Sequence, residues 1–135
     1  MRVEKMREIL FRGKRKTDNK WLYGFPYVTR KNAVKINWYC SEFGSMKTDE
    51  VIPETVGQYI GQPDKNGKKI FEGDIVKTKY GRICKVVWFA PQCCWDLVPL
   101  ECKSKVPDQY DLFDSKNLEV IGNIYDNSAE EFNTY

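Results

Sequence analysis

The residues best suited to chemistry in this chain are basic side chains beside aromatic rings near the amino terminus. They are Arg12, Lys14, Arg15, Lys16 and Lys20, followed directly by Trp21. Lysine and arginine can contact a phosphate backbone while aromatic rings stack on bases, so the set is a candidate surface for nucleic acid or another partner. The other interpretation is a charged hairpin tip that keeps a sheet edge soluble, and the sequence favours it. A second basic set, Lys65, Lys68 and Lys69, fits that interpretation too.

Catalytic residues are hard to assign because the chain contains no histidine. This removes the commonest general base and excludes a nucleophile paired with histidine. The candidate carboxylates are Glu50, Glu54, Asp64, Glu72 and Asp74. Most lie near predicted turns, where acidic residues are common for local reasons. We therefore expect no enzyme; the remote alternative is an enzyme that uses carboxylates or a cysteine thiolate.

The cysteines argue for free thiols rather than for a disulfide or metal framework. The five are Cys40, Cys84, Cys93, Cys94 and Cys102. Their number is odd and no two have CxxC spacing, so a structural zinc site has poor local geometry. A metal cluster of Cys84, Cys93 and Cys102 is a minor alternative, and we expect neither a metal nor a cofactor. Reduced thiols, no signal peptide and no long apolar run predict a cytoplasmic protein without a membrane segment.

Length and composition predict a small β protein. The 135 residues suffice for one domain or two small subdomains, and 14% are aromatic, which suits pleated sheets. The net charge of +3 is too mild to indicate a nucleic-acid binder by itself. No segment places apolar residues at helical spacing over three turns, so we expect little helix.

Alternating apolar residues and turn signals predict a series of strands. In the first half we expect strands at residues 7–12, 21–28 and 34–39, the first two forming a hairpin. Pro26 suggests an edge or a strand end. Residues 41–49 are expected to form a loop, and residues 51–56 an extended segment. The glycines of residues 57–61 are expected to serve turns and not a phosphate loop.

The second half carries the clearest turn signal, Asn66-Gly67. Strands are expected at residues 74–80, 83–89, 94–100 and 118–125, and one helical turn near residues 127–132. Gly73-Asp74-Ile75-Val76, then Gly81 and Val86-Val87-Trp88, is typical of SH3-like small barrels. We therefore predict a compact, mainly β fold with residues 1–62 as an N-terminal sheet packed on an SH3-like barrel of residues 63–126, and a tail at 127–135.

Several blocks of sequence together resemble the YopX family of phage and prophage proteins. They lie at residues 8–14, 21–24, 52–61, 64–76 and 118–127, in order and over nearly the whole chain. Residues 91–114 match least. The resemblance implies a β-rich protein of uncharacterised function in a bacterial host cell, and it provides no catalytic residue to carry over.

The sequence thus favours a phage accessory protein that binds without catalysis. The runner-up is a nucleic-acid binder that uses the basic hairpin and Trp21. The partner is expected to be an unknown protein or a second copy of the chain, since the segments around Trp38, Tyr39 and around Cys93, Cys94, Trp95 look too apolar for free loops. We predict a homo-oligomer with no specified number of subunits.

Overall fold

The protein is mainly β. A computed structural model describes residues 7–100, 114–128 and 131. Strands make up 54% of these residues and short helical turns 9%, which confirms the predicted fold class. The chain divides into two units, residues 1–61 and 62–135. Among the described residues, no helix has the length and apolar character needed to span a membrane.

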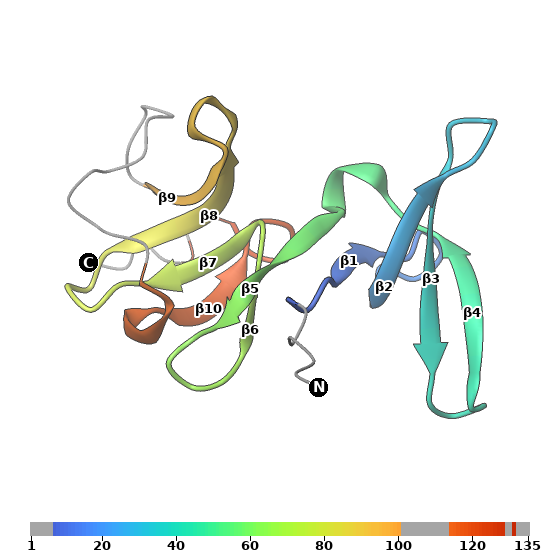
Figure 1. The fold of residues 1–135 in the computed structure, drawn as a ribbon, viewed down its shortest axis with the longest axis horizontal. Helices are drawn as coiled ribbons and strands as arrows, with labels where there is room; N and C mark the ends of the chain where they lie inside the picture. The colour runs from blue at the N-terminus through green and yellow to red at the C-terminus, as the bar shows by residue number, and fades with distance from the viewer. Residues whose placement is uncertain (1–6, 101–113, 129–130, 132–135) are drawn as a thin grey trace, which may run out of the picture. The chain divides into compact units, whose positions relative to one another are not determined.

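Unit 1 is an antiparallel sheet of consecutive strands (Figure 1). The strands are β1 (Phe11–Lys14), β2 (Trp21–Val28), β3 (Val34–Cys40), β4 (Ser45–Glu50) and β5 (Gly57–Pro63). Their order across the sheet is β4-β3-β2-β1-β5, and β5 continues into unit 2, where β6 (Lys69–Phe71) follows it. The predicted hairpin of β1 and β2 is confirmed, with Lys14 opposite Trp21 and Phe11 opposite Gly24. Its first strand is not at residues 7–12 as predicted, because β1 begins at Phe11 and includes Gly13 and Lys14, which were expected to lie in the turn.

Strand β4 corrects the prediction of a loop at residues 41–49. Only the turn at residues 41–44 is a loop, and Ser45 to Glu50 pair in register with Cys40 to Lys35 of β3. The prediction failed because β4 is an edge strand whose Ser45–Thr48 segment is exposed, so its sequence carries no apolar alternation. Charged side chains on such a strand discourage pairing with another chain.

Pro26 is also placed differently from the prediction, because β2 is an interior strand between β1 and β3. Pro26 pairs with Ile36 of β3. Strand β1 reaches only as far as Gly24, so Pro26 lies in the half of β2 that β1 does not cover. A residue without an N–H is tolerated there because no ladder bond toward β1 is required.

The segment after β4 is less extended than predicted. Ile52 has the extended backbone that a following proline favours, with φ −72° and ψ 115°, but Pro53–Thr55 form a 3-10 turn, η1. The next residues, expected to be turn glycines, belong to strand β5. Gly61 alone in that block takes a positive φ, 91°. Proline fits the first position of such a turn because its fixed φ suits it.

Unit 2 contains a second antiparallel sheet (Figure 1). Its strands are β7 (Asp74–Lys77), β8 (Ile83–Phe89), β9 (Cys94–Pro99) and β10 (Glu119–Asn123), in the order β10-β7-β8-β9, with 3-10 turns η2 (Ala90–Gln92) and η3 (Ser115–Asn117). The predicted strands are present, with β7 ending earlier than expected and the register of β10 shifting between Val120 and Gly122. Closure of this sheet into an SH3-like barrel stays a prediction. The polar stretch 101–111 lies outside the described residues.

Two buried carboxylates shape the turns of unit 2. The side chain of Asp74 accepts a hydrogen bond of 2.8 Å from the N–H of Phe71, across the turn that Gly73 makes with a φ of 88°. This is the turn-bonding role that the Gly-Asp sequence predicts. Asp64 closes the Asn66-Gly67 turn, where Gly67 takes a φ of 82°.

Candidate binding surface

One face of the unit 1 sheet is covered by exposed aromatic side chains. Alternate residues of a strand lie on the same face, and in β2 these are Trp21, Tyr23, Phe25 and Tyr27. Tyr23, Phe25 and Tyr27 are 47%, 52% and 43% exposed. Single exposed apolar residues are ordinary, but a contiguous row of rings is a mark of binding surfaces.

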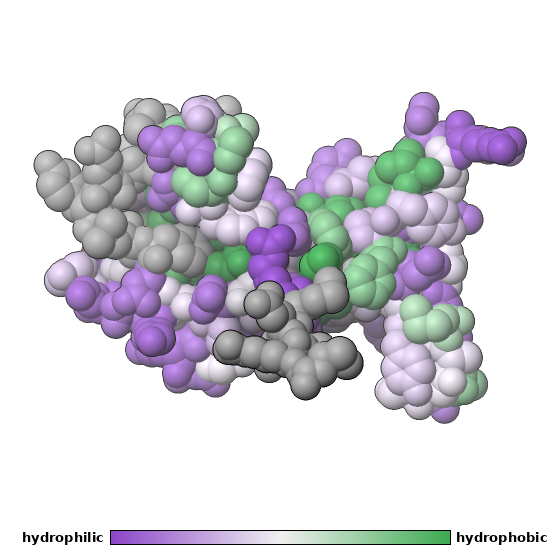
Figure 2. Space-filling model, viewed as in Figure 1, coloured by the Kyte–Doolittle hydropathy of each residue, from purple (hydrophilic) through white to green (hydrophobic). Residues whose placement is uncertain are grey.

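The strand register extends this row across β3 and β4. Phe25 lies opposite Asn37 and Tyr27 opposite Lys35, so residues 35, 37 and 39 of β3 share the face. Tyr39 is 61% exposed and lies opposite Met46 of β4, which is 60% exposed. We call the surface formed by Trp21, Tyr23, Phe25, Tyr27, Tyr39 and Met46 the aromatic face. Figure 2 shows pale and green side chains over β2 to β4 beside the purple, hydrophilic β2–β3 turn.

The rings of β2 are exposed because the opposite face of the sheet forms the core of unit 1. That core gathers Leu22, Ile36 and Val51, with Trp38 packed against it. Gly24 belongs to the core face, and a Cβ atom there would lie 1.9 Å from the carbonyl oxygen of Asn37. The small residue thus allows β2 and β3 to approach closely, while the larger side chains of β2 extend to the other side.

The structure brings two predicted basic residues, Arg12 and Lys14, together around the ring of Trp21. Arg12 has its guanidinium carbon 4.5 Å from the centre of the Trp21 ring, and Lys14 has its Nζ 5.5 Å from it. Cations at such distances are attracted to the ring face. Arg12 is only 5% exposed, so it supports the position of Trp21 but is not accessible to a large ligand.

The next two predicted residues are held by acidic partners. Arg15 forms ion pairs with Asp18 at 2.8 Å and with Asp49 at 3.5 Å, and its hydrogen bond lowers the pKa of Asp18 to about 2. Lys16 pairs with Glu50 at 2.7 Å, which raises the pKa of Lys16 and lowers that of Glu50. Charges already neutralised in this way contribute less to a phosphate contact.

Lys20, the last basic residue of the set, is exposed at the start of the hairpin's return strand, and its backbone N–H donates to Asp18. The tip of the β1–β2 hairpin therefore fits the interpretation of a charged, internally paired turn. The candidate carboxylates are also engaged locally: Glu50 pairs with Lys16, and Asp64 and Asp74 accept backbone hydrogen bonds. Glu54 lies in the first turn of η1.

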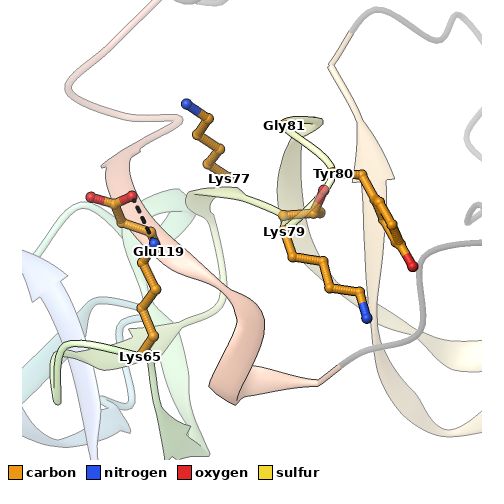
Figure 3. A pocket seen from close by; sticks show the side chains of 7 residues that line it. Lys65, Lys77, Lys79, Tyr80, Gly81 and Glu119 are labelled. Atoms are coloured by element: carbon orange, nitrogen blue, oxygen red, sulfur yellow. Dashed lines mark ion pairs between the residues drawn. The ribbon is translucent and has the colours of Figure 1, made fainter.

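Unit 2 has an open, lysine-lined depression, drawn in Figure 3. It is lined by Lys65, Lys77, Thr78, Lys79, Tyr80, Gly81 and Glu119. Lys65 pairs with Glu119 at 3.6 Å, and Lys79 lies 5.0 Å from the centre of the Tyr80 ring. Lys65, Lys77 and Lys79 are all exposed to solvent. The depression therefore resembles a solvated turn more than a preformed anion-binding site.

The described cysteines are not in disulfide bonds. Cys40 and Cys84 are buried, Cys93 is exposed and Cys94 is partly buried. Cys102 lies outside the described residues, so the cluster of Cys84, Cys93 and Cys102 stays untested. Among the residues that the structure does describe, no three His, Cys, Asp or Glu side chains are grouped as a metal site requires.

The two units differ in charge. Residues 1–61 contain 12 Lys and Arg against 7 Asp and Glu, a net charge of +5, while residues 62–135 contain 10 against 12, a net charge of −2. The overall value of +3 therefore conceals a basic unit that carries the aromatic face.

The family comparison covers the strands of both units. A family model described as YopX protein matches residues 10–130 of the 135. The chain belongs to the YopX family. The match includes every residue of the aromatic face and all the strands of both units. Comparison with curated proteins gives no match.

For this YopX-family chain, sequence reasoning found Trp21 but missed most of the aromatic face. Its signal is visible in the sequence as aromatic residues at every second position from Trp21 to Tyr27. Large rings at alternate positions usually indicate the buried side of a strand, and here they lie on the exposed side. Gly24 lies between two of these rings and has no side chain. It was the clue in the sequence that the rings of this strand lie on the exposed face.

Proposed function

We propose that this YopX-family protein is a non-enzymatic accessory protein of a bacteriophage or prophage that acts by binding in the host cytoplasm, and that the aromatic face is its binding surface. The observation that carries the proposal is the row of Tyr23, Phe25 and Tyr27, each more than two-fifths exposed on one side of β2. Leaving such rings in water has a cost that a bound partner would remove.

The absence of enzymatic activity is supported by the side chains available. The chain has no histidine, and the buried carboxylates Asp64 and Asp74 are occupied in closing turns. A turnover that depends on one side chain would overturn this part of the proposal.

The binding role can be tested by affinity capture from infected or lysogenic host cells. The parent chain is compared with a Phe25→Ala/Tyr27→Ala double variant, and with Tyr80→Ala as a control that removes a 72% exposed tyrosine from unit 2. We expect a host-cell component to be captured by the parent and by Tyr80→Ala, and not by the double variant. Equal retention by all three proteins would show that the aromatic face is not the binding surface. Nuclease treatment of parallel samples separates a nucleic-acid partner from a protein one.

A further inference from the structure

We propose that the aromatic face binds single-stranded nucleic acid, with bases stacked on the rings of β2 and phosphates contacted by lysines beside them. This inference rests on the proposed function, since it names the class of partner for the same surface. It differs from binding by the tip of the β1–β2 hairpin, because the contacting residues lie on the face of the sheet and not in the turn.

The first argument is the spacing of the rings. Side chains two residues apart on a strand are separated by about 7 Å, so Tyr23, Phe25 and Tyr27 present a regular row on one plane. Exposed rings on a sheet surface are one of the common ways in which proteins stack two or three unpaired bases. Each base offers a flat face, so such stacking tolerates any sequence.

The second argument is the position of cations at both ends of the row. Lys14 lies opposite Trp21 at one end and Lys35 opposite Tyr27 at the other. Glu50 lies opposite Lys35 on β4, but it forms its ion pair with Lys16, so the charge of Lys35 remains in excess at this end. Beyond the row, the exposed Arg30 and Lys31 extend the positive charge along the β2–β3 turn.

Polar groups occupy the middle of the same face. Asn37, opposite Phe25, is exposed and accepts a hydrogen bond from the Thr48 hydroxyl of β4. The amide nitrogen of Asn37 can donate to a base edge or a sugar from this position. A surface built only for apolar contact would not place an amide and a hydroxyl between its rings.

Charge also decides against a second copy of the chain as the occupant. A symmetric dimer brings the same patch of each subunit together, so the lysines of one aromatic face would lie against those of the other. With a net charge of +5 in unit 1, that juxtaposition is repulsive. A single strand carries a negative charge at every nucleotide and unpaired bases, whereas the bases of a duplex are stacked inside it and cannot reach the rings.

The test measures fluorescence anisotropy of labelled oligo(dT), oligo(U) and a DNA duplex with the full-length protein at low salt. We expect binding of one or both single strands, weaker binding of the duplex, and an affinity that falls steeply with added salt. Phe25→Ala/Tyr27→Ala should weaken binding by about tenfold or more, and Lys35→Ala should reduce the salt slope by about 1. Tyr80→Ala, on unit 2, should bind as the parent does.

A measurement of folding guards against an unfolded protein as the cause of lost binding. The double alanine variant should give the far-UV circular dichroism spectrum and the urea unfolding midpoint of the parent, because Phe25 and Tyr27 lie outside the core. No binding of either strand at low salt would overturn the inference, as would equal binding by the parent and the double alanine variant. A parent of twice the monomer mass that becomes monomeric in the double variant would identify a second copy instead.

The failure of this inference can be told apart from failure of the proposed function. Captured host material that resists nuclease but disappears in the double alanine variant would overturn the nucleic-acid assignment and keep the aromatic face as a binding surface. Captured material that is unaffected by the variant, together with no oligonucleotide binding, would overturn both.

Discussion

The residue that organises the turn after β5 is Asp64. Its Oδ1 accepts hydrogen bonds from the N–H groups of Asn66 at 2.9 Å and Lys68 at 2.8 Å, and its Oδ2 accepts one from Val120 at 2.9 Å. The side chain is buried. Burial raises the pKa of its carboxyl, but the three backbone donors and the positive charge of Lys68 together outweigh burial and hold the pKa below the ordinary value of 3.8. One carboxylate therefore joins a turn to strand β10, more than fifty positions away in the sequence.

We expect Asp64→Ala to lower the free energy of unfolding by about 1–3 kcal/mol, because buried N–H groups lose their acceptor. Asp64→Asn should cost less, since one oxygen remains to accept from the turn. Glu42→Gln, in an exposed turn, serves as the control and should change little. Urea titration of the three variants and the parent measures the effect. A loss for Asp64→Ala no larger than for the control would contradict this role.

The same carboxylate predicts a dependence of stability on pH. Because its pKa is lower in the folded protein than in the unfolded chain, its contribution is complete above the unfolded pKa of about 3.8 and is lost as the pH falls through the folded value. We therefore expect the parent to lose more stability on acidification below about pH 4 than Asp64→Asn does. Parallel curves for the two proteins, measured by urea titration at several pH values, would argue against it.

At the level of elements, the pairing of β2 with β3 depends on Gly24. A Cβ atom at this position meets a backbone oxygen at 1.9 Å, and backbone atoms cannot move aside without disturbing the ladder. Because Gly24 lies between Tyr23 and Phe25, the close approach that it permits also fixes the orientation of the aromatic face.

Replacement of Gly24 by alanine should lower the free energy of unfolding by about 3 kcal/mol. This is the upper end of the destabilisation that an added methyl group usually causes in a tightly packed site. The matched control is Gly13→Ala in β1, where the added Cβ meets side-chain atoms, Ile36 at 2.9 Å and Val51 and Val56 at 3.3 Å. That variant should cost less, about 1 kcal/mol, because side-chain methyls can shift by a few tenths of an ångström and a backbone carbonyl cannot. Thermal or urea unfolding of the two variants measures the difference. Equal losses of unfolding free energy would show that the close approach of β2 and β3 at Gly24 is not required for stability.

For the whole molecule, both units contain buried apolar side chains among the residues that the structure describes. Unit 1 relies on a small core around Leu22, Ile36 and Val51. The buried residues of unit 2 are more numerous and include Ile70, Phe71, Ile75, Val76, Cys84, Val86, Leu97, Val98 and Leu118. A larger buried apolar area gives greater stability, so unit 1 should open at a lower denaturant concentration.

The cysteines provide a test of this difference without any mutation. Cys40 reports on unit 1 at 6% exposure and Cys84 on unit 2 at 0% exposure. Pulsed alkylation across a urea series, with peptide mass spectrometry, should label Cys93 throughout, Cys40 at intermediate urea and Cys84 last. A shared midpoint for Cys40 and Cys84 would mean that the two units unfold together.

The predicted homo-oligomer depends on a second apolar surface, since like charges disfavour pairing of the aromatic faces. Trp88 of β8 and Trp95 of β9 pack edge to face with ring centres 5.0 Å apart, and Trp88 is 46% exposed. We expect light scattering at micromolar concentration to give more than the monomer mass, and the monomer mass for Trp88→Ala. A parent that stays monomeric when concentrated would mean that these rings serve only their own hairpin.

The sequence by itself determined most of the strands and several turns of this protein. Alternation of side chains and turn residues such as Asn66-Gly67 act over a few positions, so local physics sufficed to predict β2, β8 and β9 almost to the residue. Strand β4 could not be predicted in this way, because it is a strand only through its pairing with β3.

The tertiary structure alone decided which side of β2 faces water and which cations stay available. Rings at alternate positions fit either face equally well in the sequence, and the core of Leu22, Ile36 and Val51 placed them outside. For Arg15 and Lys16 the sequence left a ligand contact open beside the favoured hairpin tip. The fold brings Asp49 and Glu50, 34 positions away, beside them. Local patterns fix the conformation of a strand, whereas exposure and charge pairing depend on residues that only folding brings together.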